Sequence, residues 1–150
     1  MLKSLRGPIL VLSAAGIAAA VLITPAFAQK PWLRTVARHY QLDATTGKCI
    51  LCHQLKEKEE PSAKNLNTYG KDLSAQEVMK PILGKDEKYN FSNDELAIVV
   101  KAAEAINDKD SDGDGATNKE ELDLGSFPGD AASKPDGKKL DDYRKAHPKK

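Results

Sequence analysis

Five consecutive residues constrain this chain more than any others: Cys49, Ile50, Leu51, Cys52 and His53. Their C-x-x-C-H spacing puts two thiols three positions apart, so both can lie on one face of a single helical turn. Each thiol can add across one vinyl group of a porphyrin, and the imidazole that follows can bind the iron. The motif therefore predicts one covalently attached haem c, with His53 as the proximal ligand of the iron.

Other interpretations of the motif fit the rest of the sequence less well. A zinc site needs further close-set ligands, and outside the motif the chain has no cysteine and only His39 and His147. A redox disulfide between Cys49 and Cys52 is expected within a βαβ pattern, which the sequence does not contain. Chance occurrence is the remaining alternative.

The first 28 residues have the pattern of an export signal. Lys3 and Arg6 precede an almost wholly apolar run, Pro25 interrupts any helix, and residues 26–28 offer the small side chains that a signal peptidase accepts. We expect cleavage after Ala28 and a periplasmic or otherwise exported protein with no stable membrane insertion. The alternative is an uncleaved leader that anchors the protein, because the apolar run approaches the length that spans a bilayer.

The mature chain is small and nearly neutral. Residues 29–150 carry 21 basic and 22 acidic side chains, so a nucleic acid partner is not expected. A chain of this length forms one small domain with a modest core, which often needs a cofactor, a metal or a disulfide to be stable. Both cysteines belong to the motif, so no structural disulfide is expected.

Apolar periodicity predicts short helices along the mature chain. Amphipathic patterns cover residues 31–42 and 66–73, and the clearest helix covers residues 92–106, where Ser92 begins a capping box. The first and last of these helices are expected to pack against each other and to form part of the haem pocket. Residues 56–64 are highly charged, which indicates an exposed loop.

A segment directly after the last of these helices matches the calcium loop of an EF-hand. Carboxylates occupy loop positions 1, 3 and 5, glycine occupies position 6 and glutamate occupies position 12. The predicted ligands are Asp110, Asp112, Asp114, Ala116 through its carbonyl, Asn118 and Glu121. A frame that starts at Asp108 would put Lys119 at position 12, where a cation cannot serve. The alternative is a solvated acidic loop without a metal.

Position 8 of this loop is usually an apolar β-branched residue that pairs two EF-hands. Here it is Thr117, and the chain has one such loop. The loop in residues 110–121 therefore resembles the single Asp-rich calcium loops of dockerin and thrombospondin-type repeats more than a calmodulin-like sensor. The resemblance implies a structural calcium ion that neutralises the carboxylates and fixes the turn between two helices.

The sequence divides into a leader, a haem domain that contains the calcium loop, and a lysine-rich C-terminal tail: residues 1–28, 29–130 and 131–150. The tail is expected to be mobile or to form a short terminal helix with Leu140 and Tyr143 as anchors. A basic docking patch for an acidic redox partner is a further interpretation, although Asp141 and Asp142 dilute its charge.

Residues 31 to about 125 resemble small exported monohaem c-type cytochromes. Cys49 to His53 carry the resemblance, with weaker support from the Asn67-x-Tyr69-Gly70 segment and the calcium loop. The resemblance implies an all-α, cytochrome c-like bundle of three to five short helices around one covalent haem. It also implies that the haem is attached outside the cytoplasm, which agrees with the export signal.

The resemblance leaves the sixth iron ligand open. Met79 is the only methionine after the leader, and small c-type cytochromes commonly use a methionine downstream of the motif. Such a methionine usually follows a proline, whereas Pro81 comes after Met79. His39 is the weaker candidate, and a position with no protein ligand is the third alternative.

The first functional hypothesis is an exported electron carrier with a structural calcium site. We expect a monomer that is not an enzyme and that meets redox protein partners, because no catalytic side-chain constellation is visible beyond the haem motif. The alternative is a haem-based ligand sensor or a small peroxidase with an open sixth position. A haem subunit of a larger complex is a third hypothesis.

Overall fold

The computed structural model describes residues 31–85 and 89–148. Within these ranges it contains five α-helices and no strand, so the predicted all-α fold of three to five short helices is confirmed. One isolated antiparallel bridge joins His53 to Leu66. The predicted leader, residues 1–28, lies outside the described residues. Within the same ranges no helix is long and apolar enough to cross a membrane.

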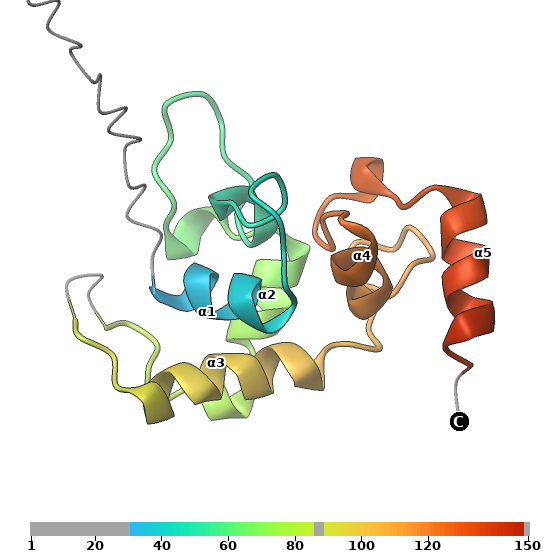
Figure 1. Ribbon diagram of the computed structural model, residues 1–150. Helices are drawn as coiled ribbons and strands as arrows, with labels where there is room; N and C mark the ends of the chain where they lie inside the picture. Colours follow the sequence, from blue (N-terminus) through green and yellow to red (C-terminus); the bar gives the residue numbers. More distant parts are fainter. Residues whose placement is uncertain (1–30, 86–88, 149–150) are drawn as a thin grey trace, which may run out of the picture.

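The helices are short, and irregular segments and 3-10 turns connect them. The α-helices are α1 (Pro31–His39), α2 (Thr68–Ser74), α3 (Asn93–Ala105), α4 (Asn118–Leu124) and α5 (Gly137–Ala146). The 3-10 helices are η1 (Cys49–Leu51), η2 (Ala63–Asn65), η3 (Glu77–Met79) and η4 (Ala131–Ser133). Figure 1 shows α3 running beneath α1 and α2, while α4 and α5 lie together at one end.

Helix α3 packs against several other elements of the core. It begins after Ser92, as the sequence predicts. The hydroxyl of Ser92 accepts a hydrogen bond from the Glu95 N–H, and the Glu95 carboxylate accepts one from the Ser92 N–H. This reciprocal pair satisfies two of the free N–H groups at the helix start. The buried positions Val99, Ala102 and Ala103 form the packed face. Helix α3 contacts α1, α2 and η3, so the expected packing of the first and last predicted helices is confirmed.

Helix α1 ends earlier than the periodicity predicts. It stops at His39, and Gln41 takes the left-handed conformation with φ 54°. The Leu42 N–H donates to the Ala37 carbonyl at 2.8 Å, and the Gln41 N–H donates to the Arg38 carbonyl at 3.3 Å. This pair of hydrogen bonds is a Schellman motif, which satisfies the last helical carbonyls and ends the helix.

The sequence predicts that the C-terminal segment is either mobile or a short terminal helix. The structure contains the helix. Leu140 of α5 is buried, and the Arg144 guanidinium donates to both carboxylate oxygens of Glu120 in α4, at 2.7 and 2.8 Å. Arg144 also donates to the Gly115 carbonyl at 2.8 Å. These contacts hold α5 against α4 and against the acidic loop before it.

Helix α2 packs directly on the C-x-x-C-H segment. Asn67, the N-cap of α2, donates from its amide nitrogen to the carbonyls of Ile50 and Leu51, at 3.0 and 3.1 Å. Its amide oxygen accepts from the Gly70 N–H at 2.8 Å. A Cβ atom at Gly70 would lie 2.1 Å from the Cys52 carbonyl oxygen, far inside contact distance. Glycine is therefore required where α2 approaches the second cysteine.

Replacing this glycine is expected to destabilise the fold. Gly70→Ala would force α2 away from Cys52, and we expect the free energy of unfolding to fall by about 1–3 kcal/mol, as for overpacking in a core. Gly137→Ala is the matched control, because a Cβ at Gly137 would meet nothing within 4 Å. The control should change stability by less than about 1 kcal/mol. Urea denaturation of both variants measures the difference, and equal midpoints would contradict the close approach.

Candidate functional site

A cavity of about 780 Å³ lies among the helices, and Cys49, Cys52 and His53 line it. Met79 lines the same cavity. Most of the remaining wall is apolar and includes Trp32, Leu33, Val36, Leu73, Leu83 and Phe91. The volume lies within the range of about 300–1,000 Å³ that is typical of ligand and cofactor sites.

The two cysteines sit on the turn that the motif predicts. Cys49 begins η1, and the N–H groups of Cys52 and His53 both donate to the Cys49 carbonyl, at 3.2 and 3.0 Å. Both thiols are free. Burial of the Cys52 thiol raises its pKa to about 12, with a smaller contribution from Cys49.

The two candidates for the second axial ligand lie in different places. Met79 is fully buried in the cavity wall, where η3 packs against α3. His39 does not line the cavity. It lies at the end of α1, where its Nε2 is 3.3 Å from Glu104 Oε1 and its ring packs edge-on against Tyr40. The structure therefore brings Met79, and not His39, to the cavity that contains His53.

Asn65 is a residue at this site that the sequence analysis missed. Its Oδ1 lies 2.9 Å from Nδ1 of His53, on the segment that the bridge to Leu66 holds beside the motif. The contact joins residues twelve positions apart. The spacing of the motif does not predict this contact. The conformation of the loop between His53 and Asn65 determines which residue lies beside the His53 ring.

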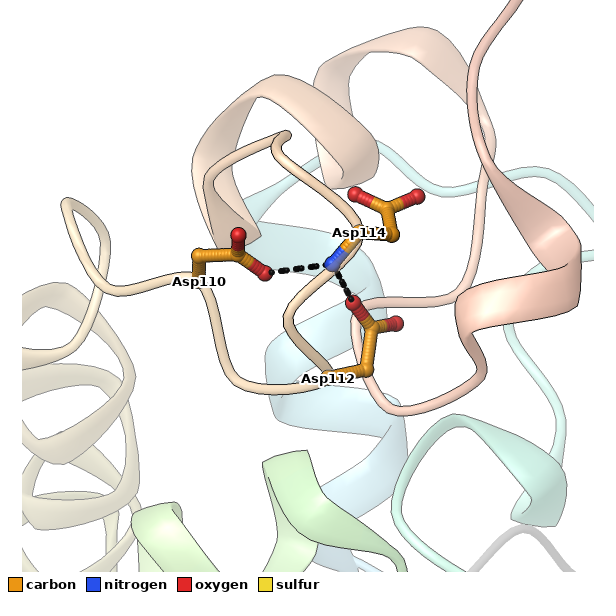
Figure 2. Close-up of side chains that lie close together, drawn as sticks. All are labelled: Asp110, Asp112 and Asp114. Atoms are coloured by element: carbon orange, nitrogen blue, oxygen red, sulfur yellow. Dashed lines mark hydrogen bonds between the residues drawn. The ribbon is translucent and has the colours of Figure 1, made fainter.

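The acidic loop folds around its own carboxylates. One oxygen from each of Asp110, Asp112 and Asp114 lies within 4.8 Å of the others. Figure 2 shows the Asp114 N–H donating to the carboxylates of both Asp110 and Asp112, each at 3.2 Å. Gly115, at loop position 6, has φ 94°, a left-handed conformation that favours glycine. The predicted turn is therefore present.

Glu121 is the least satisfied carboxylate at this loop. It lies in the first turn of α4 and is fully buried, and neither of its carboxylate oxygens has a hydrogen-bond partner among the residues that the structure describes. Burial raises its pKa to about 9, and the charges of Asp112 and Asp114 add to the shift. One oxygen of each of these two aspartates is also buried without a partner. Unpaired buried carboxylates are costly, and a cation with oxygen ligands would remove that cost.

The other two predicted calcium ligands have different surroundings. The carbonyl of Ala116 belongs to a fully buried residue at loop position 7. Asn118 is also buried, but its amide nitrogen donates to the Ile106 carbonyl at 2.7 Å and its oxygen accepts from the Ser111 N–H at 3.2 Å. The amide oxygen keeps a second lone pair, so Asn118 as a calcium ligand stays a prediction. Its side chain ties the loop to the end of α3.

Comparison of the chain with protein-family models, with curated proteins and with solved structures finds no match in any of the three. The side chains of the cavity and of the acidic loop are therefore the basis for a functional assignment.

Proposed function

We propose that the protein is a small exported monohaem c-type cytochrome that transfers electrons and carries a structural calcium ion. One observation carries the proposal. Cys49, Cys52, His53 and Met79 line a single, largely apolar cavity. These are two thiols for covalent attachment and two side chains that bind iron, and a zinc or dithiol site would not need the large apolar wall.

The cavity suits a porphyrin in polarity as well as in donor atoms. Its apolar wall matches the faces of the macrocycle, which bury a large hydrophobic area. The indole N–H of Trp32, a residue that lines the cavity, is buried and has no partner among the described residues. A buried donor of this kind is stabilised by an acceptor, and a porphyrin carboxylate would supply one.

Each residue of the cavity has a defined role in this proposal. Cys49 and Cys52 would hold the haem through thioether bonds, His53 would bind the iron as proximal ligand, and Met79 would bind it as the second axial ligand. Haem c supplies an iron that changes between the ferrous and ferric states. A methionine ligand favours the ferrous state, and the apolar wall limits the access of water to the iron. The tightly packed helices keep the ligands in place during electron transfer.

The position of Met79 supports the first of the two main hypotheses. A ligand sensor or small peroxidase needs an open sixth position, whereas a buried thioether in the cavity wall favours a closed one. The electron carrier is therefore the better supported function. Redox protein partners would meet it where Ile50 and Leu83 are 42% and 41% exposed, since Ile50 lies between the cysteines and Leu83 lines the cavity.

The proposed calcium site uses the carboxylates of Asp110, Asp112, Asp114 and Glu121 together with the Ala116 carbonyl. The buried, unpartnered oxygens of Glu121 carry this part of the proposal. Calcium takes six to eight oxygen ligands, so a bidentate glutamate and water would complete the set. The ion would fix the turn between α3 and α4, which makes its role structural.

Removal of one attachment thiol tests the haem assignment. Cys52→Ala leaves Cys49 as the single thiol, so we expect weak or absent covalent attachment. A pyridine haemochrome spectrum of the exported protein measures the number of thioether links. A spectrum still typical of two links in the variant, or the absence of haem from the wild type, would refute the proposal.

The second axial ligand can be tested with a matched pair of variants. Met79→Ala should change the low-spin spectrum of the reduced holoprotein and let carbon monoxide bind rapidly, because it removes the proposed ligand. His39→Ala should leave the spectrum unchanged, because His39 lies outside the cavity. Rapid binding of carbon monoxide to the wild type would instead favour the sensor or peroxidase hypothesis.

The calcium site predicts a specific dependence of stability on pH. The pKa of Glu121 rises from its ordinary 4.5 to about 9 in the folded, metal-free protein. The folded state therefore holds a proton that the unfolded chain releases, and the free energy of unfolding in chelator should fall as the pH rises from about 5 to about 9. Saturating calcium should suppress this fall, because the ion binds the ionised carboxylate.

Glu121→Gln is the control for this prediction, since it keeps the shape of the side chain but cannot titrate. It should lose this part of the pH dependence in chelator and most of the stabilisation by calcium. Thermal melting at three pH values, with calcium and with chelator, measures both effects. Identical wild-type melting with calcium and with chelator would exclude the site.

A further inference from the structure

We propose that Asn65 is a positioning residue for His53, and that its side-chain amide tunes the reduction potential of the site. The inference depends on the proposed function, because it concerns His53 as an iron ligand. It starts from the contact between Oδ1 of Asn65 and Nδ1 of His53, at 2.9 Å. The chemistry of that contact depends on which end of the amide faces the ring.

Two backbone hydrogen bonds determine the orientation of the Asn65 amide. Its Nδ2 donates to the Glu60 carbonyl at 2.8 Å, and its Oδ1 accepts from the Ser62 N–H at 2.8 Å. A carbonyl cannot donate and a backbone N–H cannot accept, so the opposite orientation would place like groups together at both ends. The atom that faces His53 is therefore the oxygen, which is an acceptor.

The tautomer of His53 follows from this orientation. An acceptor at 2.9 Å requires a proton on Nδ1, so the neutral imidazole has its lone pair on Nε2. This is the tautomer that a metal ligand needs when Nε2 is the coordinating atom. Asn65 therefore prepares the ring before any metal binds, because the alternative tautomer would set two lone pairs against each other.

The backbone holds the two side chains in register. The Gln54 N–H donates to the Asn65 carbonyl at 2.8 Å, and the Asn67 N–H donates to the Cys52 carbonyl at 3.0 Å. These two bonds lie on either side of His53 and form the bridge to Leu66. Asn65 is also the last residue of η2. Its side chain therefore connects the exposed loop of residues 54–62 to His53.

The strength of the contact sets its expected effect. A neutral amide oxygen is a weaker acceptor than a carboxylate, and a stronger acceptor makes the imidazole a stronger electron donor. A more strongly donating imidazole stabilises the higher charge of ferric iron and lowers the potential. Asn65→Ala removes the acceptor and should therefore raise the reduction potential.

Redox titration of the purified holoproteins tests this shift. We expect Asn65→Ala to change the electron-exchange equilibrium about tenfold, which for a one-electron couple is about 59 mV. Lys64→Ala is the control, because it alters an exposed residue of the same turn and leaves the amide in place. At high ionic strength, which screens the lost charge, its potential should equal that of the wild type. A lowered or unchanged potential in Asn65→Ala would overturn the inference.

A second measurement uses the wild-type protein, so it does not depend on whether the Asn65 variant folds. NMR of the wild-type holoprotein should show a slowly exchanging Nδ1 proton on His53 close to the Asn65 amide, and rapid exchange of that proton would overturn the inference. A wild-type chain that carries no covalent haem would refute the proposed function instead. Nitrogen NMR of that chain would still identify the tautomer of His53, and a proton on Nε2 would overturn the inference separately.

Discussion

The packing of α2 on the cysteine segment is the constraint on which both candidate sites depend. The Asn67 amide nitrogen donates two hydrogen bonds to the cysteine segment while its oxygen caps α2, and Gly70 lets the helix backbone approach the Cys52 carbonyl. Because η1 is a single 3-10 turn, it has little stability of its own. The position of Cys52 and His53 in the cavity wall therefore depends on a neighbouring helix that the motif does not include.

The same helix supports the acidic loop. Asp72 of α2 pairs with the Lys109 ammonium and accepts a hydrogen bond from the Ser111 hydroxyl at 2.7 Å. Both partners lie where the chain enters the loop, and Asn118 ties the loop to the end of α3 from the other side. The proposed calcium ion would thus stabilise a turn that is attached to the scaffold of the cavity, which suits a small domain with a modest core.

Two adjacent glutamates at the start of α4 have opposite electrostatic surroundings. Hydrogen bonds from Arg144 lower the pKa of Glu120 to about 2, so its charge is paired and serves to dock α5. Burial raises the pKa of Glu121 to about 9, and its oxygens have no hydrogen-bond partner. Both residues are buried and acidic in the first turn of α4. Only their neighbours distinguish them, since Arg144 reaches the first and three aspartates surround the second.

The sequence by itself determined the features that depend on local spacing. The turn at Cys49, the capping box at Ser92 and the left-handed Gly115 lie within a few residues of the groups that shape them, so short-range geometry specifies them. Tertiary structure alone decided that Met79 lies at the cavity and His39 does not. It likewise selected Asn65 as the partner of His53 and Arg144 as the partner of Glu120, and it ordered α5. These contacts join segments that are distant in sequence, and their geometry depends on how loops close and helices pack, which residue spacing does not encode.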